Sequence, residues 1–299
     1  MTTAQKLGYS ETDRLLIINA DDFGASHTGN ESISHLLEEG ALSSATIMMP
    51  CGWAREAARW SAAHPEHNIG IHLTFTSEWE NHKWGPVTRN AGTGSLTTAE
   101  GYFPADCLTF EKNADPQQVR IEIVQQIELA IAMGIDPTHL DNHMGSLYGL
   151  RTGRDFLDIV FDVCAAYKLP FRMPRYLTGQ YIQPAIIEIA AARAGLADTM
   201  GVLIPDYLMD WPYAPGSGES YEEVKQRMIA TLRALNAGVS ELIIHPSLVT
   251  EELKAMTPHY AWRGIELALC RDAEIRQVIE DENIKLIRWS DLREAQRGQ

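Results

Sequence analysis

The stretch Arg14-Leu-Leu-Ile-Ile-Asn-Ala-Asp-Asp-Phe-Gly24 decides how the sequence is interpreted. Its first half is a short apolar run rich in β-branched residues, which is typical of a buried strand. Asp21 and Asp22 follow at the point where this strand is expected to stop. Two adjacent carboxylates repel each other, and a metal ion with a proton acceptor is a common use for such a pair. The alternative is that one aspartate caps the next helix and the other faces solvent.

Strand and helix patterns alternate along most of the remaining chain. Apolar runs predict strands at 44–49, 68–76, 138–140, 169–173, 199–204, 241–245 and 284–287. Helical spacing predicts helices at 28–39, 53–63, 117–133, 155–167, 182–194, 221–236 and 260–280. Seven or eight such units predict an α/β protein with a closed or nearly closed barrel of parallel strands. An open doubly wound sheet is the alternative, and both place ligands at the carboxyl ends of the strands.

Two segments interrupt this alternation. From Ser77 to Pro116 the chain is rich in Gly, Pro, Asn, Thr and Trp and lacks clear periodicity. A connection of this length is usually functional or disordered, and its aromatic residues favour an ordered lid or substrate wall. A second aromatic loop is expected at 205–220, and aromatic faces pack well against sugar rings. We therefore expect one domain over residues 1–299, with a long inserted loop at about 77–116.

Composition excludes several classes of partner. The chain of 299 residues carries a formal net charge of −15, which disfavours both nucleic acid and anionic membrane surfaces. Its four cysteines are far apart and form no CxxC pair, as expected for reduced thiols in a cytoplasmic protein. The polar amino terminus does not resemble a signal peptide, and no apolar run is long enough to span a bilayer.

Titratable residues recur at the ends of the predicted strands. They are Asp21 and Asp22 after the first strand, His72 near the end of the third, His143 after the fourth, Arg172 near the end of the fifth and His245 at the end of the seventh. If the strands are parallel, all these side chains converge on one rim of the sheet. This is the strongest functional indication in the residues themselves.

Each of these residues also has a simpler interpretation. His72 could be a hydrogen-bonded histidine of the interior, and Arg172 could be an ion-pair partner for Asp21, Asp141 or another carboxylate.

If the functional interpretation holds, one carboxylate and two imidazoles fit a divalent transition metal. Catalytic zinc sites often use three protein ligands, and this set would also accept Mn, Co, Ni or Fe, whereas Mg is less natural.

Four motifs carry a resemblance to a known family. They are Asn19-Ala-Asp-Asp-Phe-Gly24, Gly70-Ile-His-Leu-Thr74, Thr138-His-Leu-Asp-Asn-His-Met144 and Glu241-Leu-Ile-Ile-His-Pro246. Together, in this order and over about residues 15–250, they resemble the YdjC/ChbG-like carbohydrate deacetylases of the polysaccharide deacetylase superfamily. The resemblance implies a distorted (β/α) barrel of the NodB-like or TIM-like kind.

The resemblance also implies an activity and roles for residues. The activity is the metal-dependent removal of the N-acetyl group from an amino sugar or short chito-oligosaccharide, with release of acetate. Asp22, His72 and His143 would hold the divalent ion, for which Zn, Mg, Mn, Co and Ni are the candidates. Asp21 would act as base, and His245 would protonate the leaving amine. Arg172, within Phe171-Arg-Met-Pro174, would steady the base.

The expected partner is a small carbohydrate, with neither nucleic acid nor membrane, and a homodimer is left open. Two other functions are also left open. One is another metal-dependent hydrolase on the same rim, such as a phosphoesterase, which would favour two metals and more carboxylate ligands. The other is a catalytically silent carbohydrate-binding protein that keeps the metal for structure.

Overall fold

The computed structural model describes residues 2–90, 92–178, 182–213 and 219–298. Within these residues seven strands form one sheet, in the order β4-β3-β2-β1-β6-β5, with β7 pairing with β1. The strands are β1 (Arg14–Phe23), β2 (Ser44–Ile47), β3 (Ile69–Leu73), β4 (Leu140–Asn142), β5 (Tyr207–Leu208), β6 (Gly238–Ile244) and β7 (Lys285–Leu286). Every pairing is parallel, so the predicted α/β class with parallel strands is confirmed.

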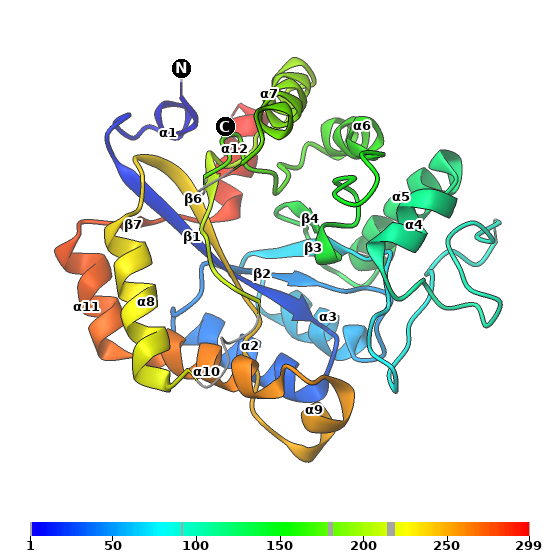
Figure 1. Cartoon of the computed structure of the whole chain (residues 1–299), viewed down its shortest axis with the longest axis horizontal. Coiled ribbons are helices and arrows are strands. Elements are labelled where there is room, and N and C mark those ends of the chain that lie inside the picture. Colours follow the sequence, from blue (N-terminus) through cyan, green and yellow to red (C-terminus); the bar gives the residue numbers. More distant parts are fainter. Residues whose placement is uncertain (1, 91, 179–181, 214–218, 299) are drawn as a thin grey trace.

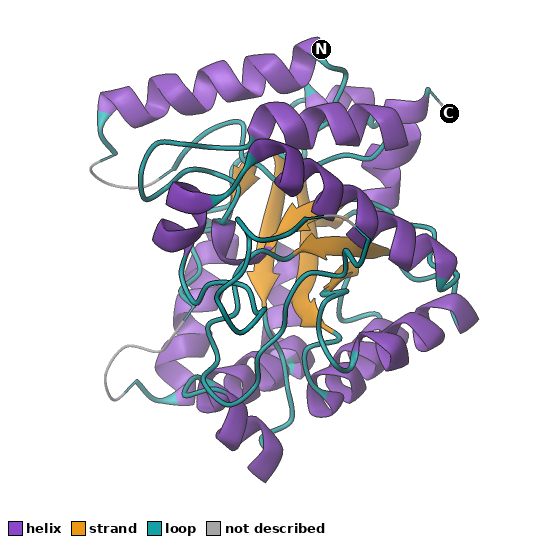
Figure 2. Cartoon of the chain, turned by 90° about the vertical axis from the view of Figure 1, so that its right-hand side faces the viewer, coloured by secondary structure: helices purple, strands orange, loops and turns teal. Residues whose placement is uncertain are grey.

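Helices surround the curved sheet (Figures 1 and 2). They are α1 (Thr3–Lys6), α2 (His27–Glu38), α3 (Ala54–Ala63), α4 (Cys107–Asn113), α5 (Pro116–Ala132), α6 (Leu157–Tyr167), α7 (Pro184–Thr199), α8 (Tyr221–Arg233), α9 (Glu251–Met256), α10 (Tyr260–Arg271), α11 (Ala273–Asp281) and α12 (Trp289–Arg297), with a 3₁₀ turn η1 at His143–Gly145. Because helices cover the outer face while side chains fill the inner one, the longer strands are buried on both faces, as parallel sheets usually are, whereas the two-residue strands β5 and β7 are partly exposed.

β1 is the central strand of the sheet. It pairs with β6 along Arg14–Ala20, and with β2 and β7 on its other edge. All its residues beyond Arg14 are buried. This explains why its sequence is a continuous apolar run instead of an alternating one. Successive side chains still point to opposite faces, so Ile18 contacts the helical layer while Asn19 points into the barrel, where it hydrogen-bonds to Asp21.

The barrel wall is irregular between β4 and β5. The strand predicted at 169–173 is wrong as a regular strand, because only Phe171 forms an isolated bridge, to Leu140. Pro170 has no N–H to continue a ladder. The segment nevertheless hydrogen-bonds on both sides, since the Arg172 N–H donates to the Leu140 carbonyl and the Phe171 N–H donates to that of Leu203. These bonds bridge the gap in the sheet and give the barrel its distortion.

The strand predicted at 199–204 is also wrong. α7 was expected to end at Gly195, but it continues to Thr199, and the next strand is the short β5. A glycine inside a helix costs only about 1 kcal/mol relative to alanine. The buried side chain of Ala197 lies in the turn beyond Gly195 and offsets this cost by packing on the core.

Two further differences come from side chains that cap helices. The predicted helix at 260–280 is divided into α10 and α11 at Asp272, whose carboxylate accepts hydrogen bonds from the Glu274 and Ile275 N–H groups. The inserted loop at 77–116 contains α4, a short helix that Asp106 caps through the Thr109 N–H. A helix as short as α4 has too few turns for its periodicity to be recognised in the sequence.

The inserted loop packs on the barrel through its aromatic side chains. Trp79, Trp84 and Phe103 are buried, and the Trp84 indole N–H donates to the Thr76 carbonyl at 2.7 Å. Residue 91 of this loop and residues 214–218 of the aromatic loop at 205–220 lie outside the described part of the chain. Among the described helices, none has both the length and the apolar character needed to span a membrane.

Candidate active site

A cavity of about 1160 Å³ lies at the carboxyl ends of the strands. All six predicted site residues line it: Asp21, Asp22, His72, His143, Arg172 and His245. The predicted convergence of these side chains on one rim is therefore confirmed, while their roles stay predictions. The rule that ligands bind at the carboxyl ends of parallel strands explains why residues far apart in the sequence meet here.

An irregularity in β1 allows both adjacent aspartates to face the cavity. The strand continues through the pair to Phe23, further than expected, but its register with β2 shifts between Ala20 and Phe23. Asp22 has a φ of 65°, which non-glycine residues rarely adopt. In a regular strand two successive side chains point to opposite faces. The bulge and the left-handed backbone of Asp22 redirect its side chain toward the same cavity as Asp21.

Three donor atoms form a nearly equilateral triangle in the floor of the cavity. Asp22 Oδ1 lies 3.6 Å from His72 Nε2 and 3.4 Å from His143 Nδ1, and the two nitrogens are 3.3 Å apart. Ligand atoms about 2.0–2.1 Å from one tetrahedral metal lie about 3.3–3.4 Å from one another. The spacing therefore matches the predicted ligand set.

The hydrogen bonding of these atoms also fits a cation. Among the described residues, Asp22 Oδ1 is a buried carboxylate oxygen without a hydrogen-bond partner. Buried polar atoms are normally paired, so such an oxygen requires an explanation. An ion held with His72 and His143 would satisfy it, and the mixed N/O donor set suits zinc and related divalent metals.

Asp141 orients the first histidine of the triangle. Its Oδ1 lies 2.7 Å from His72 Nδ1, so that nitrogen carries the proton and Nε2 is free to bind a cation. His72 and Asp141 are register partners on β3 and β4, which places the two side chains next to each other. Burial alone would lower the pKa of His72, but Asp141 and Asp21 raise it overall. A proton and a cation therefore compete for this site.

Glu78 has the same relation to the second histidine. Its Oε2 lies 2.9 Å from His143 Nε2, which directs Nδ1 toward Asp22. Burial would lower the pKa of His143, but Glu78 and Asp22 together raise it to about 10. Because Glu78 belongs to the inserted loop, the loop contributes directly to the site and does not merely cover it.

Arg172 binds the carboxylates beneath the triangle. Its guanidinium makes two bonds of 2.7 Å to Asp21, and it also pairs with Asp141 at 2.6 Å and with Glu241 at 2.9 Å. Burial would raise the pKa of Asp21, but the charge and hydrogen bonds of Arg172, together with His72 and His245, hold it below its usual value. Asp21 is thus ionised at neutral pH. Burial raises the pKa of Glu241 to about 7 despite the same arginine.

Arg263 fixes the remaining oxygen of the carboxylate ligand. Its guanidinium lies 2.5 Å from Asp22 Oδ2 and stacks over the Trp79 ring, with 5.4 Å from the guanidinium carbon to the ring centroid. Burial would raise the pKa of Asp22, but Arg263 contributes most to holding it well below the usual range. Since Oδ2 is occupied by Arg263, Asp22 offers a single oxygen, Oδ1, to a cation.

His245 stands on the wall of the cavity just beyond β6. Its backbone N–H donates to Glu266 at 2.8 Å, and its ring lies 5.6 Å from that of Tyr213, centroid to centroid. Burial lowers the pKa of His245 to about 4. The ring is therefore neutral at pH 7, whereas the role expected from the sequence requires a protonated ring at the moment of proton donation.

Sequence patterns did not identify Glu78, Glu241 or Arg263 as members of the site. Glu78 lies in an aperiodic loop and Arg263 in the middle of a helix, so neither position carries a local signal. Asp141 was recognised only as one of several partners for Arg172. His139, by contrast, does not line the cavity and packs in the interior, where it stacks on Trp289 with 4.3 Å between ring centroids.

A second group of potential ligands in the described chain is already neutralised. Asp21, His72 and Asp141 have ligand atoms within 4.8 Å of one another. However, Arg172 Nη1 lies 2.7 Å from Asp21 and 2.6 Å from Asp141. A guanidinium in this position supplies the positive charge that a second cation would otherwise bring.

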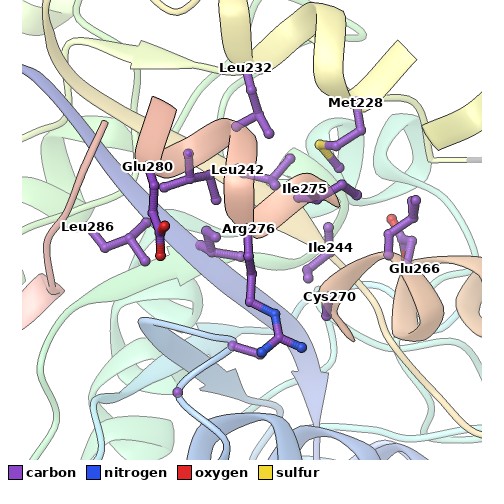
Figure 3. Close-up of a pocket in the computed structure, with 15 residues that line it drawn as sticks. Met228, Leu232, Leu242, Ile244, Glu266, Cys270, Ile275, Arg276, Glu280 and Leu286 are labelled. Carbon is purple, nitrogen blue, oxygen red and sulfur yellow. The ribbon is translucent and has the colours of Figure 1, made fainter. Parts of the chain in front are cut away.

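Another cavity lies on the opposite side of the sheet, between it and helices α8, α10 and α11 (Figure 3). Its volume is about 190 Å³. Most of its lining is aliphatic, from residues such as Met228, Leu242, Ile244 and Ile275, and Glu266 is the buried carboxylate at its edge. This cavity contains no converging set of ligand atoms among the described residues.

Comparison with known proteins places the chain in a family. The model of the YdjC-like protein family matches residues 15–281. A carbohydrate deacetylase of Thermoanaerobacter pseudethanolicus is 27% identical over 94% of this chain and 100% of its own length. One of Thermus thermophilus is 28% identical over 94% and 95%.

A solved structure supports the same fold. It is the crystal structure of an Enterococcus faecalis protein whose name proposes a role in cellobiose-phosphate cleavage. It superposes with a TM-score of 0.75 at 24% identity, over 94% of this chain and 99% of that one. Because the family model matches most of the sequence, the chain belongs to the YdjC-like protein family.

Proposed function

We propose that the protein is a metal-dependent carbohydrate N-deacetylase, which hydrolyses the acetamide of an amino sugar to acetate and a free amine. The observation that carries the proposal is the triangle of Asp22 Oδ1, His72 Nε2 and His143 Nδ1 beside the ionised Asp21. The full-length relatives named carbohydrate deacetylases support the choice of substrate class. A cation bound by the triangle would polarise the acetamide carbonyl and acidify a water molecule.

In this proposal Asp21 accepts the proton of the attacking water. The Arg172 guanidinium holds its carboxylate in a fixed orientation by two hydrogen bonds and keeps it ionised. Asn19 and Thr46 donate further hydrogen bonds to Oδ1, at 2.8 and 3.2 Å. A base fixed from three directions loses little entropy when it reacts, which favours proton transfer.

In this proposal His245 returns a proton to the departing nitrogen. Hydrolysis removes one proton from water and adds one to the amine, so the protons balance without an outside acid. Because the resting ring is neutral, the proton that His245 delivers is the one that leaves the attacking water through Asp21, and His245 takes it up after the attack begins. The negative charge that develops in the tetrahedral intermediate favours an imidazolium nearby.

The site favours amide hydrolysis over the phosphoesterase alternative. Two-metal phosphoesterases hold their ions about 3.5–4 Å apart and need ligands for both. Here the carboxylates that could hold a second ion are paired with Arg172. A silent sugar-binding protein would have no need for a base and a neutral histidine beside the metal ligands.

The experiment is a screen for acetate release from N-acetylglucosamine, its 6-phosphate and short chito-oligomers. Each substrate is tested after chelation and after addition of Zn, Mn, Co, Ni or Mg, with p-nitrophenyl phosphate as the control for phosphoesterase activity. Metal-dependent acetate release supports the proposal. Phosphate release without acetate would replace it with the phosphoesterase, and sugar binding without acetate release under any metal would favour the silent protein.

A further inference from the structure

Helix α7 presents aliphatic side chains to the active-site cavity. Ile186, Ile189, Ala190 and Arg193 line the cavity and are spaced i, i+3, i+4 and i+7, so they form one face of the helix. Ile186 is 47% exposed and Ile189 is 58% exposed. Two isoleucines on the inner face of a binding cavity are left with much of their surface in water.

Among the described residues, the contacts that anchor α7 in the core lie in its carboxyl-terminal half. Ala194 and Ala197 are its buried residues, and both lie in its carboxyl-terminal half. Arg193 fixes the same half through Asp155 at 2.8 Å and Asp158 at 2.9 Å, so that α7 lies beside α6 (Figure 1). The isoleucines in its amino-terminal half lie beyond this anchor, along the cavity wall.

Apolar residues outside α7 line the same cavity, and together with Ile186 and Ile189 they are called its aliphatic wall. Leu150, which is 70% exposed, Leu177 and Met144 line the cavity as well. The cavity volume of about 1160 Å³ exceeds the range of about 300–1,000 Å³ that holds a drug-sized ligand. A single amino sugar at the metal ligands would therefore leave this aliphatic wall uncovered.

The chemistry of the wall limits what can cover it. Aliphatic side chains offer no partner to sugar hydroxyls, and a polysaccharide chain pressed against them would lose hydrogen bonds to water. An alkyl or acyl chain loses none and gains about 0.8 kcal/mol for each methylene removed from water. Continuity with the metal ligands indicates that this chain belongs to the same molecule as the sugar.

Resting on the proposed deacetylase function, we infer that the substrate is an amphiphilic amino sugar, whose aliphatic chain packs against the Ile186 and Ile189 face of α7. The acetamide would then lie at the metal ligands and the aliphatic group at the wall. The inference assigns specificity to α7, while the chemistry stays with the residues at the ends of the strands.

The test compares the methyl and octyl β-glycosides of N-acetylglucosamine, below the concentration at which the octyl compound forms micelles. Wild-type protein should release acetate from the octyl glycoside with a kcat/KM at least ~10-fold above that for the methyl glycoside, as the burial of a few methylenes predicts. The double variant Ile186→Ser, Ile189→Ser should reduce this ratio to near one. A general loss of folded protein would lower both rates and leave the ratio unchanged.

Ile187→Ser is the matched control. Ile187 is 49% exposed on the same helix but does not line the cavity. It should leave the octyl-to-methyl ratio and the rate on the methyl glycoside unchanged. If Ile187→Ser lowers the ratio as much as the double variant does, or if the wild-type ratio is already near one, the inference is wrong.

Two further readouts separate the remaining outcomes. If neither glycoside yields acetate, the proposed function fails for these sugars, and calorimetric dissociation constants for the two glycosides still test the wall. Size-exclusion chromatography tests whether the exposed isoleucines instead contact a second copy of the chain. A wild-type dimer that the double variant converts to a monomer, with the octyl preference unchanged, would overturn the inference in favour of a homodimer interface.

Discussion

Two cavities in the described part of the chain differ in what surrounds their buried polar groups. In the cavity at the carboxyl ends of the strands, Asp21 and Asp22 are compensated by Arg172 and Arg263. In the cavity between the sheet and helices α8, α10 and α11, Glu266 is the buried carboxylate (Figure 3). It accepts hydrogen bonds from the His245 N–H and the Trp211 indole, and burial raises its pKa to about 7.

The same strand contributes to both cavities. Along β6, Ile243 lines the active-site cavity, whereas Leu242 and Ile244 line the other. The period of two along a strand therefore separates residues that serve the chemistry from residues that serve packing. Both regions contain a cavity, so a cavity alone does not identify a site. The first one is the candidate site because charged side chains converge there around Asp22 Oδ1, the buried oxygen without a hydrogen-bond partner among the described residues.

The largest effect is expected from Asp21→Asn in the active-site cavity. This change keeps the shape of the side chain but removes the base, so kcat for acetate release should fall by about 10²–10⁴-fold. Metal content, measured by elemental analysis, should stay near the wild-type value because Asp21 is not a member of the triangle. Full activity in this variant would remove Asp21 as the base.

Leu242→Ala, in the cavity between the sheet and helices α8, α10 and α11, should affect stability and not activity. It enlarges an aliphatic hollow, so the free energy of unfolding should fall by about 2–5 kcal/mol in denaturant titrations. The kcat of the folded protein should not change, since Leu242 faces away from the site. A large loss of kcat with little loss of stability would contradict the separation between the two cavities.

Glu266 should make stability depend on pH. A carboxyl whose pKa is higher in the folded than in the unfolded chain binds more protons when folded. Its contribution is therefore present below its ordinary value of 4.5 and is lost as the pH rises through about 7. The loss amounts to about 3 kcal/mol at most.

Glu266→Gln should flatten the decline in unfolding free energy between pH 5 and 8, measured by chemical denaturation. Glu241 shifts in the same direction, so part of the slope should remain. An unchanged slope would show that Glu266 is ionised in the folded protein and is better compensated than its surroundings indicate.

The smallest effect is expected from Glu78→Ala. Loss of the carboxylate that orients His143 should weaken metal binding by about 10–100-fold in calorimetric titrations. Glu80→Ala is the matched control, because Glu80 lines the same cavity, whereas it is Glu78 that contacts His143. Equal affinities for the Glu78 variant and wild type would reduce Glu78 to a surface residue.

The sequence predicted the parts of the fold and site that local patterns encode. The apolar run before Asp21 identified β1, and polar residues at the ends of separate strands identified the rim. It could not predict the irregular segment at 169–173. There Pro170 interrupts the hydrogen-bond ladder of a strand, and hydrogen bonds to Leu140 and Leu203 hold the segment in place instead. Nor could it predict the turn of Asp22 into the cavity, which depends on a bulge between β1 and β2.

The residues that orient the site were the hardest to predict. Arg263 reaches Asp22 from α10, across a sequence separation of 241 residues. Glu78 reaches His143 from an aperiodic loop, 65 residues away. Such contacts arise from tertiary packing, so no local spacing in the sequence predicts them. The residues that they orient, Asp22 and His143, were predicted from the sequence.

The position of a bound ion tests the proposed metal site more directly than any variant. A crystal grown with zinc should show one anomalous scattering peak about 2 Å from each of Asp22 Oδ1, His72 Nε2 and His143 Nδ1. The same peak should be absent in His72→Ala and His143→Ala. A peak among Asp21, Asp141 and Arg172 instead, or full zinc occupancy in both alanine variants, would contradict the assignment of Asp22, His72 and His143 as the metal ligands.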